Sequence, residues 1–209
     1  MRRRKAPEER RQEILDATVE TAIRLGLDAV TARDIARTAG IVPGLIHHYF
    51  SSVEELLAEA FASWADDVLE RVREVPRELP APVRIAALVS SLTPGQRFWH
   101  DALSAAVRHH GLRERARRLT IDYVEHVESV IRDGIDEGSF VCAEPRLSAW
   151  RIILMVDGLV PMVFVLGLLD LDEVRRLLGG IVEKELGLEP GIFALIEPPP
   201  LHGGEFGQA

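Results

Sequence analysis

The sequence predicts an all-α protein, and three observations support this prediction. Apolar residues recur at helical spacing along almost the whole chain. No alternating run of apolar and polar residues is long enough to form a sheet. Proline or glycine opens or closes most of the expected helices, as is usual at helix ends. With 209 residues and 47% hydrophobic content, the chain can bury a real core beneath about nine helices.

The amino-terminal helices are expected to be one long and two short. The first is predicted over Pro7–Leu25, because proline suits the first turn of a helix. Thr31 and Asp34 have the spacing of a capping box, which opens a short helix closed by Gly40. A second short helix is predicted over Pro43–Tyr49.

The remaining helices follow from similar signals. Ser52 and Glu55 form a second capping box, at the start of a long helix that stops before Pro76. The segment REVPRELPAP holds three prolines and is the expected connector. Further helices are expected over residues 82–92, 94–109, 112–137, 145–168 and 172–186. The end EPPPLHGGEFGQA has the composition of a disordered tail.

Composition limits the compartment and the kind of partner. The net charge of -8 argues against a protein that coats nucleic acid, so any DNA contact must be local. The single cysteine, Cys142, is typical of a reducing compartment and leaves only a bridge between two subunits as a possible disulfide. Residues 152–169 have the length of a membrane helix, but Asp157 and Pro161 interrupt them. We expect a cytoplasmic protein with no membrane segment.

The two short helices and their glycine turn have the spacing of a helix-turn-helix, whose second helix lies in the DNA major groove. Six apolar residues can pack between them: Ile35, Ala36, Ala39, Ile41, Ile46 and Phe50. The outer surfaces keep Arg33, Arg37, Leu45, His47, His48 and Tyr49. Gly44 would let the backbone approach DNA closely. The pattern alone fits a helical hairpin within a larger bundle equally well.

The stretch ILDATVETAIRLGLDAVTARDIARTAGIVPGLIHHYFSSVEELL carries a more specific signal. Over residues 12–61 it resembles the amino-terminal domain of TetR-family transcriptional repressors, with matches at Thr31, Ile35, Ala36, Ala39, Gly40, Gly44, Phe50 and Leu56. The ending HHYF is most similar to the BetI-like branch, which contains the choline-responsive repressor of the betaine pathway. The later stretches EGSF and AWRIILMVDGL resemble the carboxy-terminal domain of that branch.

Three positions depart from the family pattern. Val42 stands where a serine or threonine usually caps the second short helix, Pro43–Tyr49, which we call the reading helix. Pro43 nevertheless fixes the first turn of this helix. His47 replaces a common phosphate-contacting tyrosine, and Val53 replaces a usual lysine. A basic arm over residues 1–10 contains Arg2 to Lys5, and Arg10 and Arg11 lie at its end. We expect these residues to enter the minor groove and to supply part of the missing attraction to DNA. A solvated tail is the alternative interpretation of this arm.

The resemblance implies roles for the residues that match. Thr31 would hold a phosphate at a helix amino terminus, while Arg33 and Arg37 would reach a phosphate or a base edge. His48 and Tyr49 would donate hydrogen bonds to DNA. The expected DNA-binding residues are Thr31, Arg33, Arg37, Val42, Pro43, Gly44, Leu45, His47, His48 and Tyr49.

The domain organisation follows from these assignments. We expect a DNA-binding domain over residues 11–52, an effector-binding and dimerisation domain over 53–188, and a tail over 189–209. The last two long helices are apolar on more than one face, which predicts a four-helix interface in a homodimer. The resemblance implies the same dimer, and its two-fold symmetry predicts a near-palindromic operator.

The resemblance also implies a small-molecule effector bound among the middle helices. The candidate lining is Trp64, Phe98, Trp99, Leu103, Tyr123, His126, Trp150, Met155 and Asp157. Ordinary core packing is the alternative for each of these residues. An apolar or aromatic effector would suit them, and a cation could sit over the tryptophan rings near Asp157. That the effector is choline does not follow from HHYF, which lies in the DNA-reading half.

Other classes of function have weaker support. Four histidines, His100, His109, His110 and His126, lack the spacing of a metal site, so no metal or cofactor is expected. Cys142 and Asp157 lie in no catalytic motif, so we do not expect an enzyme. A helical protein-interaction module without DNA binding is the main alternative. The expected function is a DNA-binding transcriptional repressor that a small molecule releases from its operator.

Overall fold

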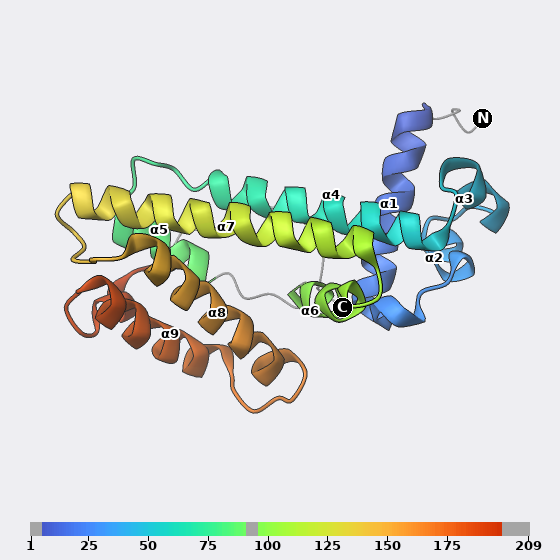
Figure 1. Cartoon of the computed structure of the whole chain (residues 1–209). Helices are drawn as coiled ribbons and strands as arrows, with labels where there is room; N and C mark the ends of the chain where they lie inside the picture. Colours follow the sequence, from blue (N-terminus) through green and yellow to red (C-terminus); the bar gives the residue numbers. More distant parts are fainter. Residues whose placement is uncertain (1–5, 91–95, 198–209) are drawn as a thin grey trace. The chain divides into compact units, whose positions relative to one another are not determined.

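A computed structural model describes residues 6–90 and 96–197, and in these residues it confirms the all-α prediction (Figure 1). The described residues form nine α-helices and two short 3₁₀-helices, with no strand. In chain order the elements are α1 (Pro7–Leu25), η1 (Leu27–Ala29), α2 (Ala32–Thr38), α3 (Pro43–Tyr49), α4 (Val53–Arg73), α5 (Ala81–Ser90), α6 (Gln96–Ala106), α7 (His110–Asp136), α8 (Pro145–Phe164), α9 (Leu171–Leu186) and η2 (Ile192–Leu195).

The described residues fall into two compact units. The first contains residues 6–67 and 96–119, and the second contains residues 68–90 and 120–197. The helices α4 and α7 therefore contribute residues to both units. These units do not correspond to the domains expected over residues 11–52 and 53–188, so the expected boundaries stay a prediction.

Most helix bounds agree with the sequence prediction, and the largest difference is at the end of α8. The helix was expected to reach residue 168 but ends at Phe164. The amides of Val165 and Leu166 both donate to the carbonyl of Pro161, and the following turn has Gly167 at a φ of 60°. A positive φ is readily adopted by glycine, so Gly167 allows the chain to leave the helix axis here.

The core of the first unit includes aromatic rings from α4 and α6. Phe61 and Trp64 of α4 lie 5.7 Å apart between ring centroids, and both pack against Phe98 of α6 at 5.7 and 5.5 Å. Trp99 lies over Phe61 at 6.0 Å. All four side chains are buried. Aromatic burial of this kind contributes strongly to core stability and here connects α4 to α6.

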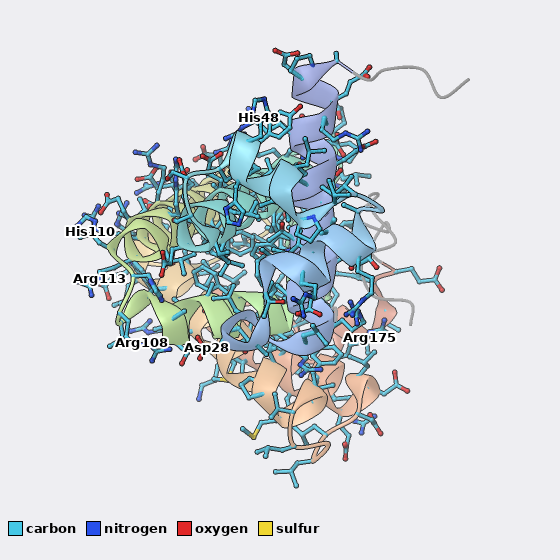
Figure 2. All side chains as sticks on the ribbon, turned by 90° about the vertical axis from the view of Figure 1, so that its right-hand side faces the viewer. Asp28, His48, Arg108, His110, Arg113 and Arg175 are labelled. Atoms are coloured by element: carbon cyan, nitrogen blue, oxygen red, sulfur yellow. The ribbon has the colours of Figure 1, made fainter. Side chains whose placement is uncertain are left out.

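Within the first unit, a hydrogen bond connects η1 to α6, and an ion pair connects η1 to Arg108, just after α6. The amide of Leu27 donates to the Asp101 carboxylate at 3.4 Å. Asp28 pairs with Arg108 at 3.1 Å, although both side chains are largely exposed (Figure 2). Exposed pairs contribute little to stability, so we assign the positioning of η1 mainly to its packing against α6.

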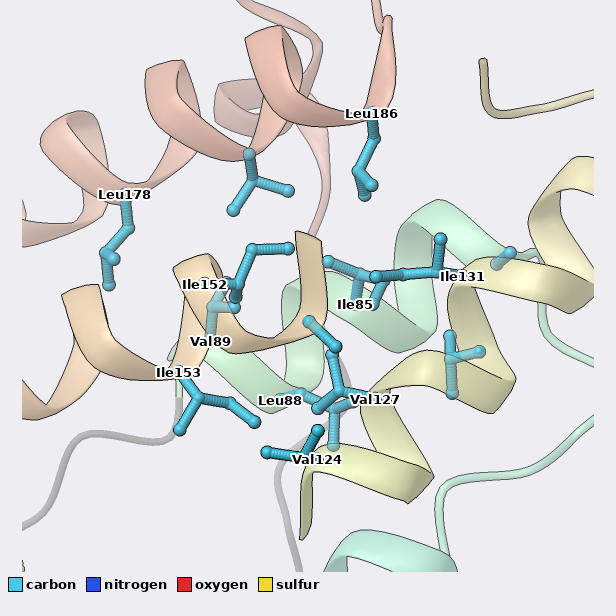
Figure 3. Close-up of a cluster of buried hydrophobic side chains, with 14 of the residues drawn as sticks. Ile85, Leu88, Val89, Val124, Val127, Ile131, Ile152, Ile153, Leu178 and Leu186 are labelled. Carbon is cyan, nitrogen blue, oxygen red and sulfur yellow. The ribbon is translucent and has the colours of Figure 1, made fainter. Parts of the chain in front are cut away.

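The core of the second unit is a cluster of aliphatic side chains from α5, α7, α8 and α9 (Figure 3). On α9 the buried residues Val174, Leu178, Val182 and Leu186 recur every four positions, so they share one helix face. This face packs against α8, which contributes Ile152, and against α5, while α7 contributes further aliphatic residues to the same cluster. The period seen in the sequence therefore places one face of each helix in this core.

The helix α8 is the one described helix that is long and apolar enough to cross a membrane by length and composition. One such helix is weak evidence for a membrane protein, because the core helix of a soluble protein has the same properties. In the structure Ile152 and Ile153 of α8 belong to the apolar cluster of the second unit.

A polar network connects the loop before α8, the first turns of α8 and helix α9. Ser148 donates to the Glu185 carboxylate at 2.6 Å, and Arg151 donates to the same oxygen at 2.6 Å. Cys142 Sγ lies 3.1 Å from Ser148 Oγ. Since the serine hydrogen points to Glu185, the thiol is the donor in this contact. Burial raises the pKa of Glu185, but the hydrogen bonds from Ser148 and Arg151 outweigh it and lower this pKa overall.

Part of the predicted tail is ordered against α9. The element η2 lies within it, and its Phe193 amide donates to the Glu183 carboxylate at 2.9 Å. The Phe193 side chain packs on Gly179, where an added Cβ would lie 3.1 Å from the Phe193 Cβ. The segment EPPPLHGGEFGQA lies outside the described residues apart from Glu197.

Candidate nucleic-acid interface

The helices α2 and α3 pack on a small apolar core that the sequence predicted. Ile35, Ile46 and Phe50 are almost fully buried. The turn between the helices is closed by a bond from the Ile41 amide to the Ala36 carbonyl at 2.9 Å, with Gly40 at a φ of 62°. This is the usual arrangement after a helix that ends at a left-handed glycine. The angle between α2 and α3 is therefore held by both packing and backbone hydrogen bonds.

The residues predicted to contact DNA lie mostly on the outside of these two helices. The exposed ones are Thr31, Arg33, Arg37, Val42, Pro43, Gly44, His47 and His48, while Leu45 and Tyr49 are half-buried. His48 projects from α3 (Figure 2), and its ring meets the Tyr49 ring edge-on, 5.3 Å away between centroids. The structure thus brings all ten residues onto one pair of adjoining helices and the turn residues before each.

At the start of α2, Thr31 and Asp34 contact each other as the predicted capping box requires, with one additional bond. Thr31 Oγ1 accepts the Asp34 amide at 3.3 Å, as expected. The carboxylate of Asp34 accepts the Thr31 hydroxyl hydrogen at 2.5 Å, and a hydrogen bond from the Thr31 backbone also helps to lower the Asp34 pKa. An aspartate is one carbon shorter than the glutamate of a standard box, so its carboxylate also lies within reach of the hydroxyl.

Asp34 also orients Arg37, one turn further along α2. Arg37 donates to the second carboxylate oxygen at 2.7 Å, and its side chain remains largely exposed. The hydrogen bond from Thr31 and then the charge of Arg37 hold the pKa of Asp34 below its usual value. Thr31 and Arg37 would have to exchange these contacts, in part, for contacts with a phosphate.

We predict that Thr31→Val raises the pKa of Asp34, because the largest cause of its depression is removed. A carboxylate with a depressed pKa contributes stability above its unfolded-state pKa and loses it as the pH falls through the folded-state pKa. The variant should therefore be less stable than the wild type near neutral pH, and the difference should shrink in acid. Carboxyl NMR titration and thermal unfolding across pH measure both effects. Thr31→Ser keeps the hydroxyl, and an unchanged Asp34 pKa in Thr31→Val contradicts this account.

The start of α3 shows the departure noted at Val42. Val42 is 70% exposed, has an extended backbone and makes no side-chain cap, while Pro43 occupies the first helical position. The proline is pre-organised for the helix, which offsets part of a missing cap worth about 1 kcal/mol. The first turn of α3 is therefore stabilised by the backbone conformation of Pro43, without a hydrogen bond from a capping side chain.

The start of α4 uses one more serine than the sequence predicted. Ser52 Oγ accepts the Glu55 amide at 3.0 Å, which confirms the first half of the box. The Glu55 carboxylate then accepts the amide and hydroxyl of Ser51, at 2.7 and 2.5 Å. These bonds, led by the Ser51 hydroxyl, lower the pKa of Glu55. The adjacent SS pair is the signal that could have indicated this double contact.

Two arginines expected to support a DNA-binding arm have partners within the first unit. Arg10 lies in α1 and pairs with Glu13 at 2.6 Å. Arg11 pairs with Glu59 of α4, and its guanidinium lies 4.9 Å from the centroid of the Phe50 ring. Arg11 thus holds α1, the end of α3 and α4 together, a role that depends on a partner 48 positions away. The residues Arg2 to Lys5 lie outside the described part of the chain.

The candidate effector residues fall into two sets. Trp64, Phe98 and Trp99 belong to the aromatic core of the first unit, whereas Leu103 is partly exposed on α6. Trp99 Nε1 and His100 Nε2 are buried without a hydrogen-bond partner among the described residues. Such unsatisfied donors and acceptors are costly in a folded protein.

The other five candidates lie in the second unit. Tyr123 and Trp150 pack against its apolar cluster, and Met155 is partly exposed. Burial, and then the charge of Asp157, raise the pKa of Tyr123 above its usual value. Trp150 also borders an open surface hollow of about 500 Å³ beside the start of α8. His126 lines a separate cavity. In the described residues no group of three or more His, Cys, Asp or Glu side chains is placed to hold a metal.

Comparison with known proteins identifies both halves of the chain. The description "Bacterial regulatory proteins, tetR family" matches residues 14–60, and "BetI-type transcriptional repressor, C-terminal" matches residues 85–187. The BetI regulator of Rhizobium meliloti is 31% identical over 163 residues, which are 72% of this chain and 75% of that protein. The chain belongs to the TetR family. The repressor KstR2 of Rhodococcus jostii is 31% identical over 138 residues, covering 63% of this chain and 68% of that protein.

Solved structures support the TetR fold. A transcriptional regulator from Saccharomonospora viridis, solved in complex with choline, superposes with a TM-score of 0.76 at 22% identity, over 86% of this chain and 98% of that one. The relatives of this TetR-family protein are named as regulators and not as enzymes. The chain is therefore a DNA-binding transcriptional regulator with a helix-turn-helix, as the sequence predicted.

Proposed function

We propose that this TetR-family protein is a cytoplasmic repressor that binds a near-palindromic operator as a homodimer and leaves it when a small molecule binds. The exposed surface of α3 carries this proposal. It presents Gly44, His48 and Tyr49 on a helix whose opposite side is buried through Ile46. Such a surface fits a major groove, where base edges and phosphates are within reach. We take residues 11–52 as the DNA-binding domain and residues 53–188 as the effector-binding and dimerisation domain.

Tyr49→Ala is expected to lower operator affinity by about tenfold or more, because a hydrogen bond to a charged phosphate contributes roughly 1.5–3 kcal/mol. Tyr49 lies at the end of α3 and is half-buried, so Tyr49→Ala should lower the thermal unfolding temperature somewhat but leave the protein folded at the temperature of the binding assay. Fluorescence anisotropy with a labelled operator measures the affinity. Tyr49→Phe keeps the ring and loses the hydroxyl, so it isolates the hydrogen bond. Normal binding by a folded Tyr49→Ala protein contradicts the assigned role.

Exposed apolar side chains on the last two long helices support the homodimer. Each helix also buries a face in the second unit, so these side chains are additional to the core. The exposed apolar residues on α8 and α9 are Leu147, Leu154, Met155, Leu171 and Leu177. A second copy of the chain would cover them in a four-helix interface. Leu154, at 61% exposure, is the most exposed of the five, so Leu154→Glu should shift the solution mass from dimer to monomer.

The effector remains a class and not a named compound. The aromatic set of Trp64, Phe98 and Trp99 favours an apolar or aromatic molecule, whereas a carboxylate at Asp157 favours a cation. Choline is a reasonable first probe of the second class, because a relative of the same fold was solved with it. A tenfold loss of operator affinity on effector binding requires about 1.4 kcal/mol of coupling between the two sites.

The test is selection of bound duplexes from a random DNA pool at two salt concentrations, with the solution mass recorded alongside. An enriched inverted repeat bound by a dimer or a pair of dimers would support the proposal and provide the operator for effector screening. Enrichment should weaken at higher salt, since phosphate contacts release counterions. If folded protein enriches no sequence at low salt, the helical protein-interaction module becomes the better account.

A further inference from the structure

Basic residues gather at the junction between α6 and α7, in the same compact unit as the helix-turn-helix. Between residues 108 and 118 the chain has five arginines and one glutamate, in a protein of net charge -8, and all five arginines are exposed. We call Arg108, His110, Arg113 and Arg117 the basic ridge. The last three recur three and four positions apart, so they share one face of α7. Figure 2 shows His110, Arg113 and Arg108 following one another along one edge of the view.

The charges of α7 are sorted along the helix. Residues 110–119 belong to the first unit and carry four arginines and one glutamate, whereas residues 120–136 belong to the second unit and carry five carboxylates and one arginine. The amino terminus of a helix has a partial positive charge, so arginines are better placed towards the other end. Helix stability therefore gives no reason for this order, and a negatively charged partner at the positive end would give one.

Contacts within the first unit place the ridge beside α2 and α4. Arg108 pairs with Asp28 of η1 at 3.1 Å. At the start of α7, a Cβ added to Gly111 would lie 3.6 Å from the Ala58 Cβ of α4. Asp28 precedes Thr31 by three residues, so their Cα atoms are at most about 11 Å apart. The ridge therefore begins close to the start of α2, where a DNA phosphate is expected.

The three ridge arginines differ in how they are held. Arg113 donates to the carbonyls of Ala106 and Val107 at 3.1 and 3.0 Å, so its charge is fixed at the end of α6. The side chain of Arg117 has no hydrogen bond or ion pair with another described residue. Arg108 is 58% exposed, and such exposed pairs are weak, so a phosphate could replace Asp28 as its partner. Arg108 and Arg117 are thus available to an external partner.

We propose that the basic ridge is a second DNA-contacting surface, which binds backbone phosphates next to the one expected at Thr31. The DNA backbone is the favoured partner because its charges repeat along a line, as those of the ridge do, and because the ridge lies in the unit that contains the helix-turn-helix. Phosphate contacts add affinity and fix orientation without reading sequence. The inference rests on the operator binding proposed above and adds a surface outside α2 and α3.

The test measures the affinity of the full-length protein for the selected operator duplex over a range of salt concentrations, by fluorescence anisotropy. Each neutralised phosphate contributes about 0.9 to the slope of log affinity against log salt. The ridge variant, Arg108→Ala with Arg117→Ala, should lower this slope by about 1.8 per protomer and weaken binding by about tenfold or more at low salt. The same loss should occur on an unrelated duplex, because the contacts read no sequence.

The matched control removes two exposed arginines from the second unit. Arg73→Ala with Arg77→Ala changes the net charge equally, and Arg73 is the last residue of α4, about 30 Å along the helix from Val53. The slope of this control should stay near that of the wild type. An unchanged slope in the ridge variant, or an equal decrease in the control, would overturn the proposal and leave an acidic protein as the better partner for the ridge.

Asp28→Asn tests the contact of Arg108 with DNA. It releases Arg108 from its carboxylate, so operator affinity should rise several-fold. In the Arg108→Ala background the gain should be smaller, because the released side chain is missing. Equal gains in both backgrounds would mean that Asp28 acts only through its charge and that Arg108 does not contact DNA.

Failure of this inference can be told apart from failure of the proposed function. A wild-type protein that binds no DNA would refute both, whereas normal wild-type binding with an unchanged slope in the ridge variant refutes the second surface alone. Thermal unfolding shows whether the variants are folded. If the double variant does not fold, Arg117→Ala alone should lower the slope by about 0.9.

Discussion

Gly44→Asp is expected to abolish operator binding, with a loss of more than about 100-fold, while the protein stays folded. Gly44 is exposed on the first turn of α3, and no atom lies within 4 Å of the place where a Cβ would be. An aspartate near a helix amino terminus is favourable for the free helix. The same carboxylate would face DNA phosphates and occupy the space that lets the backbone approach, so it opposes binding. Operator titration and thermal unfolding measure the two effects.

Two further variants separate charge from bulk at Gly44. Gly44→Ala adds one methyl group and should stabilise the protein by up to about 1 kcal/mol, because alanine is the better helix former. Its operator affinity should nevertheless fall. Gly44→Lys adds more volume with the opposite charge. If Gly44→Lys binds normally and Gly44→Asp does not, charge decides; if all three variants bind like the wild type, Gly44 does not approach DNA.

Gly134→Ala is expected to destabilise the protein by about 3 kcal/mol, at the upper end of the cost of overpacking. An added Cβ would lie 2.1 Å from Cδ2 and 2.4 Å from Cε2 of the Phe140 ring. That ring has little freedom to move, because it is buried and the Phe140 amide is bonded to the Gly134 carbonyl at 3.0 Å. Urea unfolding provides the measurement.

The control for this variant is another helical glycine. Gly158→Ala on α8 meets no atom within 4 Å and should be neutral or stabilising. A double-mutant cycle tests the cause directly. In the Gly134→Ala background, Phe140→Leu should cost less than it does in the wild type, since it removes the clash. Equal costs in the two backgrounds would mean that Gly134 acts through something other than the Phe140 ring.

Local sequence signals predicted the ends of most helices well, because these ends depend on neighbouring residues. Proline at the first position set the starts of α1 and α3. The start of α9 was predicted one residue late, since the capping box of Asp170 and Glu173 was not recognised. The exposed side of α2 and α3 followed from the same helical period.

Features that depend on distant residues could not be predicted in this way. The sequence predicts that Arg11 supports the basic arm, because Glu59 and Phe50 are far from it along the chain. Only the fold brings these two residues next to Arg11. The order of η2 depends on Gly179 leaving space for Phe193. An effector pocket is likewise a tertiary property, so composition could suggest its residues but not their arrangement.

The thiol of Cys142 offers a practical route to watching this regulator move. It is the only cysteine of the chain, and it donates to Ser148 within the network that includes Glu185. A serine at this position could donate the same hydrogen bond, so Cys142→Ser should give a thiol-free protein in one step. New cysteines on exposed sites of α3 would then carry spin labels, and the distance between two labels in a dimer would report how far the reading helices separate when an effector binds.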